Sequence, residues 1–265
     1  MPEPIELNWN GGRATITLNR PDRANVLDSD ASAVLGRIVS ELAERAEVGR
    51  LRAVLLHGRG PQFSDGGDIR EFASAGDELA ALLDRGIPPL HRAIDTLASL
   101  PVPIVCAVNG SLGGGGIGLA LAADIVLASE CARLRGGYSD IGLSPDVGVS
   151  WALARLAGPM RAKQILFTNR TYSAQECLAM GLFVEIFPAD ELLPAATRLV
   201  DQLARSSPHS LARIKSLVDG AATRGLREQL ELEHRAMVEC AASADAAEAV
   251  RAFVAKPEYR GSAMN

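Results

Sequence analysis

A glycine-rich segment could bring backbone amide groups close to a negatively charged ligand. The stretch NGSLGGGGIGLALAAD covers residues 109–124, and Gly113, Gly115 and Gly118 fit a GxGxxG frame. Between a strand and a helix, this frame suits the pyrophosphate of a dinucleotide, with Glu130 as the ribose-binding acid. Unpaired N–H groups at a helix start suit a developing oxyanion equally well.

Two features favour the oxyanion. The run lies more than a hundred residues into the chain, and only about eight residues separate Gly115 from Asp124, which is short for a crossover helix. An oxyanion hole also needs a second donor from elsewhere in the chain. The glycine turn FSDGGDIRE at 63–71 follows an apolar segment and could supply it.

The elements around these turns alternate in type. IELNW and RATITLN, joined by NGG, predict a β-hairpin. Helical spacing through Glu47, with Asp28 or Ser29 as N-cap, predicts a helix. Strands are expected at RAVLLHG, PIVCAV, DIVLAS and LFVEIFP, and helices at HRAIDTLASL and SWALARLAG. This alternation is typical of an α/β architecture built from repeated units.

The chain is almost continuously helix-compatible from residue 190 to 255. Its apolar residues form two stripes, one of Leu211, Ile214, Leu217 and Val218 and another of Leu226, Leu230 and Met237. Such helices serve oligomerisation or belong to the core of the same domain. We divide the chain into a core of residues 1–195 and a helical oligomerisation region of residues 196–265.

Composition excludes several classes of function. The chain is 48% hydrophobic and 4% aromatic, which predicts a core of small aliphatic side chains. A net charge of −5 without a basic block argues against nucleic-acid and membrane partners. The four cysteines lack zinc-ligand spacing, so we expect reduced thiols and no metal. No secretory signal or membrane-spanning run is evident, and we expect a soluble, cytoplasmic protein.

Several motifs together resemble the crotonase superfamily, which is the enoyl-CoA hydratase/isomerase family. They are RPDRAN, FSDGGDIRE, PVPIVCAVNGSLGGGGIGLALAADIVLAS and IGLSPDVGVSWALARLAG, and the resemblance runs in order from Ile5 to FVAKPEYRG. It implies a spiral of ββα units, a helical carboxyl-terminal region, and a homotrimer or a hexamer made of two trimers. It also implies a coenzyme A thioester as substrate, with no other cofactor.

In this family two peptide N–H groups bind the thioester oxygen. Matching the motifs places them at Gly67 and Gly115. Family hydratases also use two glutamates to activate water, and here those positions hold Gly118 and Tyr138. Neither replaces a carboxylate as general base at neutral pH, so we do not expect ordinary hydration.

Asp146 matches the aspartate of family isomerases that move a double bond. It could take a proton from one carbon and return it two carbons away. The alternative role is an N-cap for the helix VGVSWALARL. We therefore predict an enoyl-CoA isomerase with Asp146 as acid/base.

A second family member has a similar pair of residues. In 4-chlorobenzoyl-CoA dehalogenase an aspartate attacks the ring and a histidine activates water, and Asp146 and His91 match them. Tyr138 replaces that enzyme's tryptophan, and a histidine on this helix is also compatible with simple packing. A non-catalytic acyl-CoA binder and a nucleotide-binding oxidoreductase are the remaining alternatives.

The resemblance also implies how coenzyme A is held. Arg70 matches a basic residue near its adenine and phosphates, and Arg23, Ala24 and Asn25 match a segment beside the pantetheine and adenine. Phe253 and Lys256 match residues lent by a neighbouring subunit. Each of these residues is also compatible with an ordinary surface position. We expect Phe72, Tyr138 and Gly118 in the walls of the substrate pocket.

Overall fold

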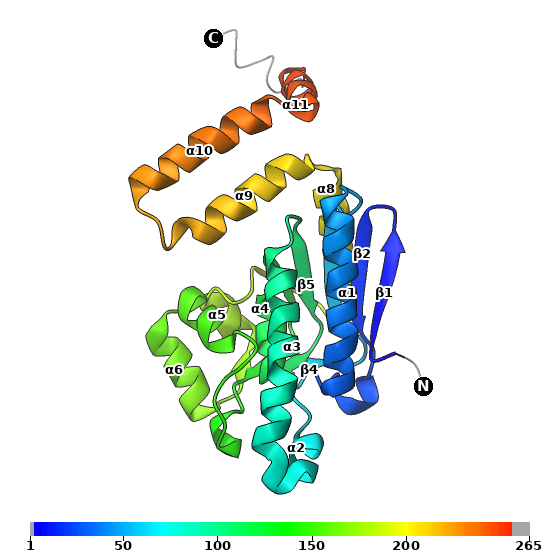
Figure 1. The fold of residues 1–265 in the computed structure, drawn as a ribbon, viewed down its shortest axis with the longest axis vertical. Coiled ribbons are helices and arrows are strands. Elements are labelled where there is room, and N and C mark those ends of the chain that lie inside the picture. The colour runs from blue at the N-terminus through cyan, green and yellow to red at the C-terminus, as the bar shows by residue number, and fades with distance from the viewer. Residues whose placement is uncertain (1–2, 256–265) are drawn as a thin grey trace. The chain divides into compact units, whose positions relative to one another are not determined.

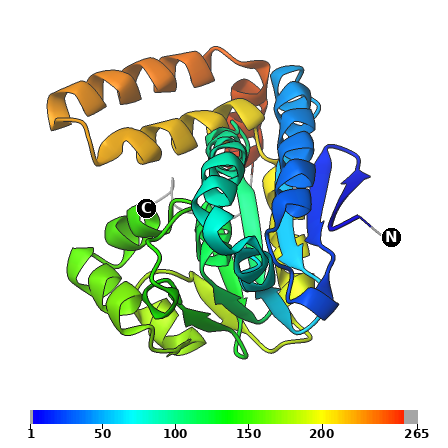
Figure 2. The same ribbon diagram turned by 60° about the horizontal axis from the view of Figure 1, so that its bottom comes forward.

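The computed structural model describes residues 3–255, and the chain divides into two compact units. The first unit extends to Leu203 and holds two sheets and most of the helices, and the second begins at Ala204 and is helical. Figures 1 and 2 show the chain from two directions.

The larger sheet has six strands in the order β1-β2-β3-β5-β7-β10. Only the β1–β2 hairpin is antiparallel, and the other pairs are parallel. The predicted hairpin is therefore confirmed. The strands are β1 (Ile5–Asn10), β2 (Arg13–Leu18), β3 (Ala53–Gly58), β5 (Ile104–Val108), β7 (Ile125–Ser129) and β10 (Glu185–Phe187).

The smaller sheet has four strands in the order β4-β6-β8-β9. They are β4 (Gln62–Ser64), β6 (Ser111–Gly113), β8 (Arg133–Arg135) and β9 (Tyr172–Ser173). The pairs β3/β4, β5/β6 and β7/β8 each place one strand in each sheet, and helical segments follow each pair. These repeated ββα units confirm the predicted spiral.

The helical segments of the first unit lie between these strand pairs and after β10. They are η1 (Pro21–Arg23), α1 (Ser29–Glu47), α2 (Ile69–Ala75), η2 (Gly76–Glu78), α3 (Leu79–Ser99), α4 (Gly115–Leu121), η3 (Ser139–Ile141), α5 (Val149–Leu156), α6 (Pro159–Thr168), α7 (Ala174–Ala179) and α8 (Leu192–Arg205). Helices α1 and α3 lie side by side (Figures 1 and 2). Asp28 caps α1 by accepting a hydrogen bond from the N–H of Ala31, as predicted.

The core lies between the sheets and these helices. Strands β3 and β5 are buried along nearly their whole length, as their apolar runs predict. One expectation differs in extent, because the strand expected at LFVEIFP is limited to Glu185–Phe187. Leu182 and Phe183 are instead buried side chains that precede the strand. Only three residues of β10 pair with β7, so the strand is as short as this pairing.

The second unit consists of α9 (Pro208–Ala221), α10 (Leu226–Ala241) and α11 (Ala244–Val254). Part of each predicted stripe is exposed in the single chain, including Ile214, Val218, Leu226, Leu230 and Met237. Within residues 3–255, no helix combines the length and the apolar character that crossing a membrane requires.

Candidate active site

The two glycine turns meet at one cavity of about 750 Å³ in the first unit. Gly67 and Gly115 both line it, together with Asp146 and Tyr138. Helix α3 contributes Leu83, Ile87 and His91, which are four residues apart and so share one face of the helix. Phe72 of α2 completes an apolar wall beside these polar groups.

Backbone packing fixes the glycine turns against each other. Gly66 has φ +81°, and a Cβ added there would lie 2.6 Å from the nitrogen of Gly115. Only glycine therefore allows this approach. Among the described residues, no acceptor is present for the N–H of Gly67 or of Gly115. Both donors remain available to a ligand in the cavity.

The dinucleotide interpretation does not match this geometry. Gly113 belongs to β6, while Gly115 begins α4, a helix of seven residues that is buried throughout. Such a short, enclosed helix differs from the crossover helix of a nucleotide-binding fold.

Asp146 faces the glycine turn. A Cβ added to Gly115 would lie 3.7 Å from Oδ1 of Asp146. The hydroxyl of Tyr138 donates a hydrogen bond of 2.7 Å to the same oxygen. The alternative role as N-cap is wrong, since Gly148 occupies the N-cap of α5 and no side chain accepts a hydrogen bond there.

The environment of Tyr138 keeps its hydroxyl protonated. Its side chain is 8% exposed, and burial raises its pKa well above the ordinary value. The negative charge of Asp146 raises this pKa further. At neutral pH Tyr138 is therefore a hydrogen-bond donor and cannot serve as a general base.

His91 is oriented toward the same loop. Its Nε2 accepts a hydrogen bond of 3.0 Å from the N–H of Val147. This nitrogen must be unprotonated, so the arrangement contains neutral histidine with its proton on Nδ1. Nε2 is already occupied by this hydrogen bond.

Gly118, expected in the wall of the substrate pocket, does not line the 750 Å³ cavity. It lines a separate cavity of about 460 Å³, which shares Asp146 and His91 with the first cavity. A Cβ at Gly118 would overlap the carbonyl oxygen of Val147. The space that a longer side chain would need at position 118 is therefore filled by the Val147 backbone.

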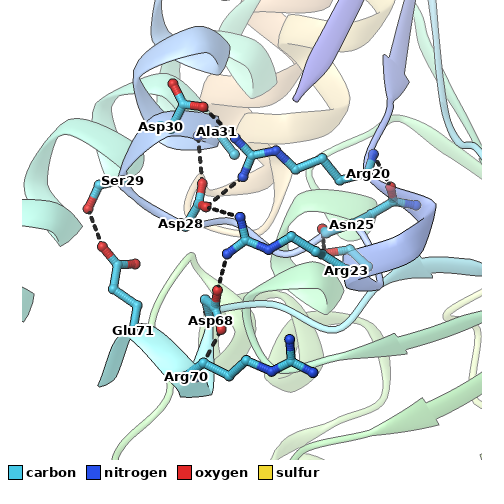
Figure 3. Close-up of polar contacts among 11 residues, drawn as sticks. Arg20, Arg23, Asn25, Asp28, Ser29, Asp30, Ala31, Asp68, Arg70 and Glu71 are labelled. Atoms are coloured by element: carbon cyan, nitrogen blue, oxygen red, sulfur yellow. Dashed lines mark hydrogen bonds and ion pairs between the residues drawn. The ribbon is translucent and has the colours of Figure 1, made fainter. Parts of the chain in front are cut away.

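A further cavity of about 310 Å³ adjoins Gly67 and is lined by Arg23, Ala24 and Arg70. Arg23 forms an ion pair with Asp68, which also accepts a hydrogen bond of 2.9 Å from the N–H of Arg70 at the start of α2 (Figure 3). The Arg70 side chain is exposed. The predicted Arg23 and Arg70 thus lie on the walls of one hollow.

Electrostatic interactions stabilise the charged forms of both Arg23 and Asp68. Partial burial acts to raise the pKa of Asp68, but the N–H of Arg70 and the guanidinium of Arg23 outweigh it, and the net pKa is lowered. The hydrogen bond to Asp68 raises the pKa of Arg23. Arg23 also lies 3.4 Å from Asp28, so one guanidinium joins the start of α1 to the start of α2.

Asn25 holds the loop with its side chain. The side chain is buried, and its amide donates hydrogen bonds of 3.0 Å to the carbonyls of Arg59 and Gln62. Its Oδ1 accepts from the N–H of Arg20 at 2.8 Å. Any contact of Asn25 with a ligand would therefore use its backbone.

Several charged residues of these walls were not predicted from the sequence, among them Asp65, Arg133 and Arg135. Asp65 lines both the 750 Å³ and the 310 Å³ cavities, and loss of solvent raises its pKa. Arg133 and Arg135 line the larger cavity from β8. Asp65 directly precedes the glycine pair in FSDGG, which is a usable signal. For Arg133 and Arg135, the sequence offers only the alternation of two charged residues around Leu134, which is typical of a strand and does not indicate a site.

The two predicted residues near the carboxyl end have different outcomes. Phe253 is exposed on α11, in the second unit. Lys256 lies outside the described residues.

Comparisons with known proteins agree with this architecture. Residues 8–261 match the Enoyl-CoA hydratase/isomerase family model. The 1,2-epoxyphenylacetyl-CoA isomerase of Escherichia coli (strain K12) is 34% identical, over 94% of this chain and 95% of the relative. The crystal structure of an enoyl-CoA hydratase from Polaromonas sp. JS666 has 31% identity and a TM-score of 0.87, over 94% of this chain and 96% of the other.

A second solved structure adds a ligand to this comparison. A putative enoyl-CoA hydratase from Thermobifida fusca YX, in complex with acetoacetyl-CoA, has 30% identity and a TM-score of 0.82, over 89% of this chain and 94% of the other. The family match across nearly the whole sequence and the close agreement of folds lead to one conclusion. The chain belongs to the enoyl-CoA hydratase/isomerase family and has the crotonase fold.

Proposed function

We propose that this enzyme moves a double bond within an enoyl-CoA thioester, with Asp146 as acid/base. The observation that carries the proposal is the position of the Asp146 carboxylate in the same cavity as the unpaired N–H groups of Gly67 and Gly115. One similar relative is named an isomerase of an acyl-CoA, which supports the same class of reaction.

The reaction needs one base and two fixed donors. Asp146 takes a proton from the carbon between the thioester carbonyl and the double bond, and the electron pair moves onto the thioester oxygen as an enolate conjugated with that double bond. Gly67 and Gly115 donate hydrogen bonds to that oxygen, and each contributes about 2.7–4 kcal/mol on the scale of oxyanion donors. Asp146 then returns the proton two carbons away, so no atom is gained or lost.

Coenzyme A would extend from this cavity into the adjoining hollow. Gly67 lines both, which gives a continuous path from the oxyanion donors to Arg23 and Arg70. Guanidinium groups are suited to phosphates. The Thermobifida fusca structure is described as a complex with acetoacetyl-CoA, a ligand of this kind.

Hydration is the main competing reaction, since the Polaromonas structure is named a hydratase. It requires a base that activates water. Gly118 has no side chain and its Cβ position is filled by Val147, while Tyr138 stays protonated and donates to Asp146. Neither position supplies a carboxylate, so the site supports isomerisation over hydration. Dehalogenase-like hydrolysis is not favoured either, because Nε2 of His91 is occupied by Val147.

The decisive experiment compares 3-enoyl-CoA isomerisation with crotonyl-CoA hydration in the wild type and in Asp146→Asn. We expect isomerisation to exceed hydration in the wild type. We expect the variant to lose about 10³-fold in kcat, within the range for a general acid/base. Asp95→Asn is the matched control, because Asp95 lines only the 460 Å³ cavity. Rapid hydration that survives Asp146→Asn would contradict the mechanism.

A proton-exchange experiment distinguishes an enzyme from a non-catalytic acyl-CoA binder. Incubation with acyl-CoA in deuterated water, followed by mass spectrometry, should show incorporation of deuterium at the carbon beside the thioester. An absence of exchange together with tight binding would identify a binder.

The assembly is part of the proposal. The exposed apolar residues of α9 and α10, among them Val218, Leu230 and Met237, would be covered by further copies of this chain in a homotrimer or a dimer of trimers. Phe253 would then reach the ligand of a neighbouring copy. Light scattering should give a mass of three or six chains, and Leu230→Asp should lower it. A monomer at micromolar concentration would contradict this assembly.

A further inference from the structure

Two side chains outside the loop that carries Asp146 hold this loop by hydrogen bonds. Tyr138, which precedes η3, donates its hydroxyl hydrogen to Oδ1 of Asp146 at 2.7 Å. His91 of α3 accepts the N–H of Val147 at 3.0 Å. One contact holds the carboxylate and the other holds the peptide that follows it.

Val147 has a conformation that needs support. Its φ is +51°, which is unfavourable for a β-branched residue. Its side chain is buried, and its Cγ2 lies 2.9 Å from the Cβ position of Gly115, so it packs on the oxyanion turn. Its carbonyl oxygen fills the space beside Gly118. Strained backbone of this kind persists where several contacts define it, and the bond to His91 is one of them.

The pair of contacts leaves one carboxylate oxygen for chemistry. Tyr138 occupies Oδ1, whereas Oδ2 of Asp146 has no hydrogen-bond partner within the described part of the chain. Asp146 lines the cavity with Gly67 and Gly115, and Oδ2 keeps its lone pairs while Oδ1 is held by Tyr138.

We propose that Tyr138 and His91 are positioning residues that hold Asp146 from two sides, with Tyr138 orienting the carboxylate and His91 fixing the strained peptide of Val147. This inference rests on the proposed function, because it concerns the proton shuttle by Asp146. It gives both residues roles other than lining the pocket or activating water. Neither residue exchanges a proton with the substrate.

The test for Tyr138 uses a second tyrosine as control. Tyr138→Phe removes the hydrogen bond to Asp146, and we expect kcat to fall about tenfold with KM changed less than about twofold. Tyr172 is also buried, and its hydroxyl has no hydrogen-bond partner among residues 3–255, so Tyr172→Phe should keep the wild-type kcat. An unchanged kcat in Tyr138→Phe would overturn the role of Tyr138.

A double variant separates positioning from general loss of structure. If Tyr138 acts only through Asp146, the combination Tyr138→Phe with Asp146→Asn should be no slower than Asp146→Asn alone. A further tenfold loss in the double variant would show that Tyr138 acts by another route.

For His91 the discriminating comparison is between two substitutions. His91→Leu removes the acceptor, and we expect about a tenfold loss of kcat. His91→Gln offers a carbonyl oxygen at similar reach and should recover most of that loss. If His91→Gln is as slow as His91→Leu, the histidine takes part in proton transfer and the inference is wrong.

The inference and the proposed function can fail separately. Full isomerisation by Asp146→Asn would refute the proposed function itself. An inactive Asp146→Asn combined with fully active Tyr138→Phe and His91→Leu would preserve the function and refute only the positioning roles.

Discussion

The two sides of the active-site cavity are held in place by different means. On the oxyanion side, the turns at Gly66 and Gly115 approach each other so closely that backbone atoms fill the space a Cβ would need. On the acid/base side, Asp146 depends on hydrogen bonds to the side chain of Tyr138 and, through Val147, to His91. At Gly66 the first side requires glycine. On the second side, a substitution at Tyr138 or His91 would change how Asp146 is held.

This difference explains how one fold supports different chemistry. In the proposed mechanism, the turns at Gly67 and Gly115 supply what a reaction through a thioester enolate needs. The loop around Asp146 would then set where the proton comes from and whether water has a base. In this chain the Val147 backbone occupies the space beside Gly118, and Asp146 is the carboxylate to which we assign the proton transfer.

Gly66→Ala should most strongly disrupt the oxyanion side. The added Cβ would lie 2.6 Å from the nitrogen of Gly115, so the two turns must separate and a donor is displaced. We expect kcat/KM to fall by about 10²–10³, the cost of losing one oxyanion donor. Gly158→Ala is the control, because Gly158 also has a positive φ of 84° but has no atom within 4 Å of a Cβ. Equal activity of the two variants would contradict the close approach.

Gly118→Ala should destabilise the fold on the acid/base side. Its Cβ would overlap the Val147 carbonyl, and we expect a loss of about 3 kcal/mol in the free energy of unfolding, the upper part of the range for overpacking. Gly113→Ala, whose nearest atom is 3.6 Å away, should lose less than about 1 kcal/mol. Urea denaturation measures both. Gly118→Glu should gain no hydration activity, and a gain would show that the loop moves aside.

Arg23→Gln and Arg70→Gln should weaken binding of the coenzyme A portion. We expect KM for an acyl-CoA to rise about tenfold in each, with kcat changed little, because a charged hydrogen bond to phosphate is lost. Arg161→Gln on α6 is an exposed control. A pantetheine thioester without the nucleotide should show no such difference. An equal rise of KM for that shorter substrate would place the arginines elsewhere on the ligand.

Asp68→Asn should have a small effect on stability that depends on pH. The folded protein lowers the pKa of Asp68, so its carboxylate stabilises the fold above the ordinary carboxyl range and loses this contribution as the pH falls through that range. We expect the wild type to exceed the variant by less than about 1 kcal/mol at pH 7, since the Arg23 side chain is 41% exposed. The difference should shrink as the pH falls below the ordinary carboxyl range and vanish below the lowered pKa of Asp68 in the folded protein. A difference that grows toward acid pH would have the wrong sign.

Local patterns predicted most of the fold. The hairpin, the capped helix from Ser29 to Glu47 and the buried strands β3 and β5 all follow from neighbours within a few residues. The strand expected at LFVEIFP was too long, because its true extent depends on how much of β7 it can pair with. The N-cap role for Asp146 failed for a similar reason. Gly148 takes the N-cap position, and the Asp146 carboxylate accepts instead from Tyr138, eight residues earlier.

Sequence alone was enough to locate the two glycine turns, the strands β3, β5 and β7, the helix α1, the missing glutamates at positions 118 and 138, and Asp146. The smaller sheet, the filling of the space beside Gly118 by Val147, the pairing of Arg23 with Asp68, and the contact of His91 with Val147 across 56 residues emerged from the folded chain. Turns and caps depend on local torsion angles and nearby donors. Contacts between distant residues depend on the packing of whole elements, which brings side chains together that no sequence spacing relates.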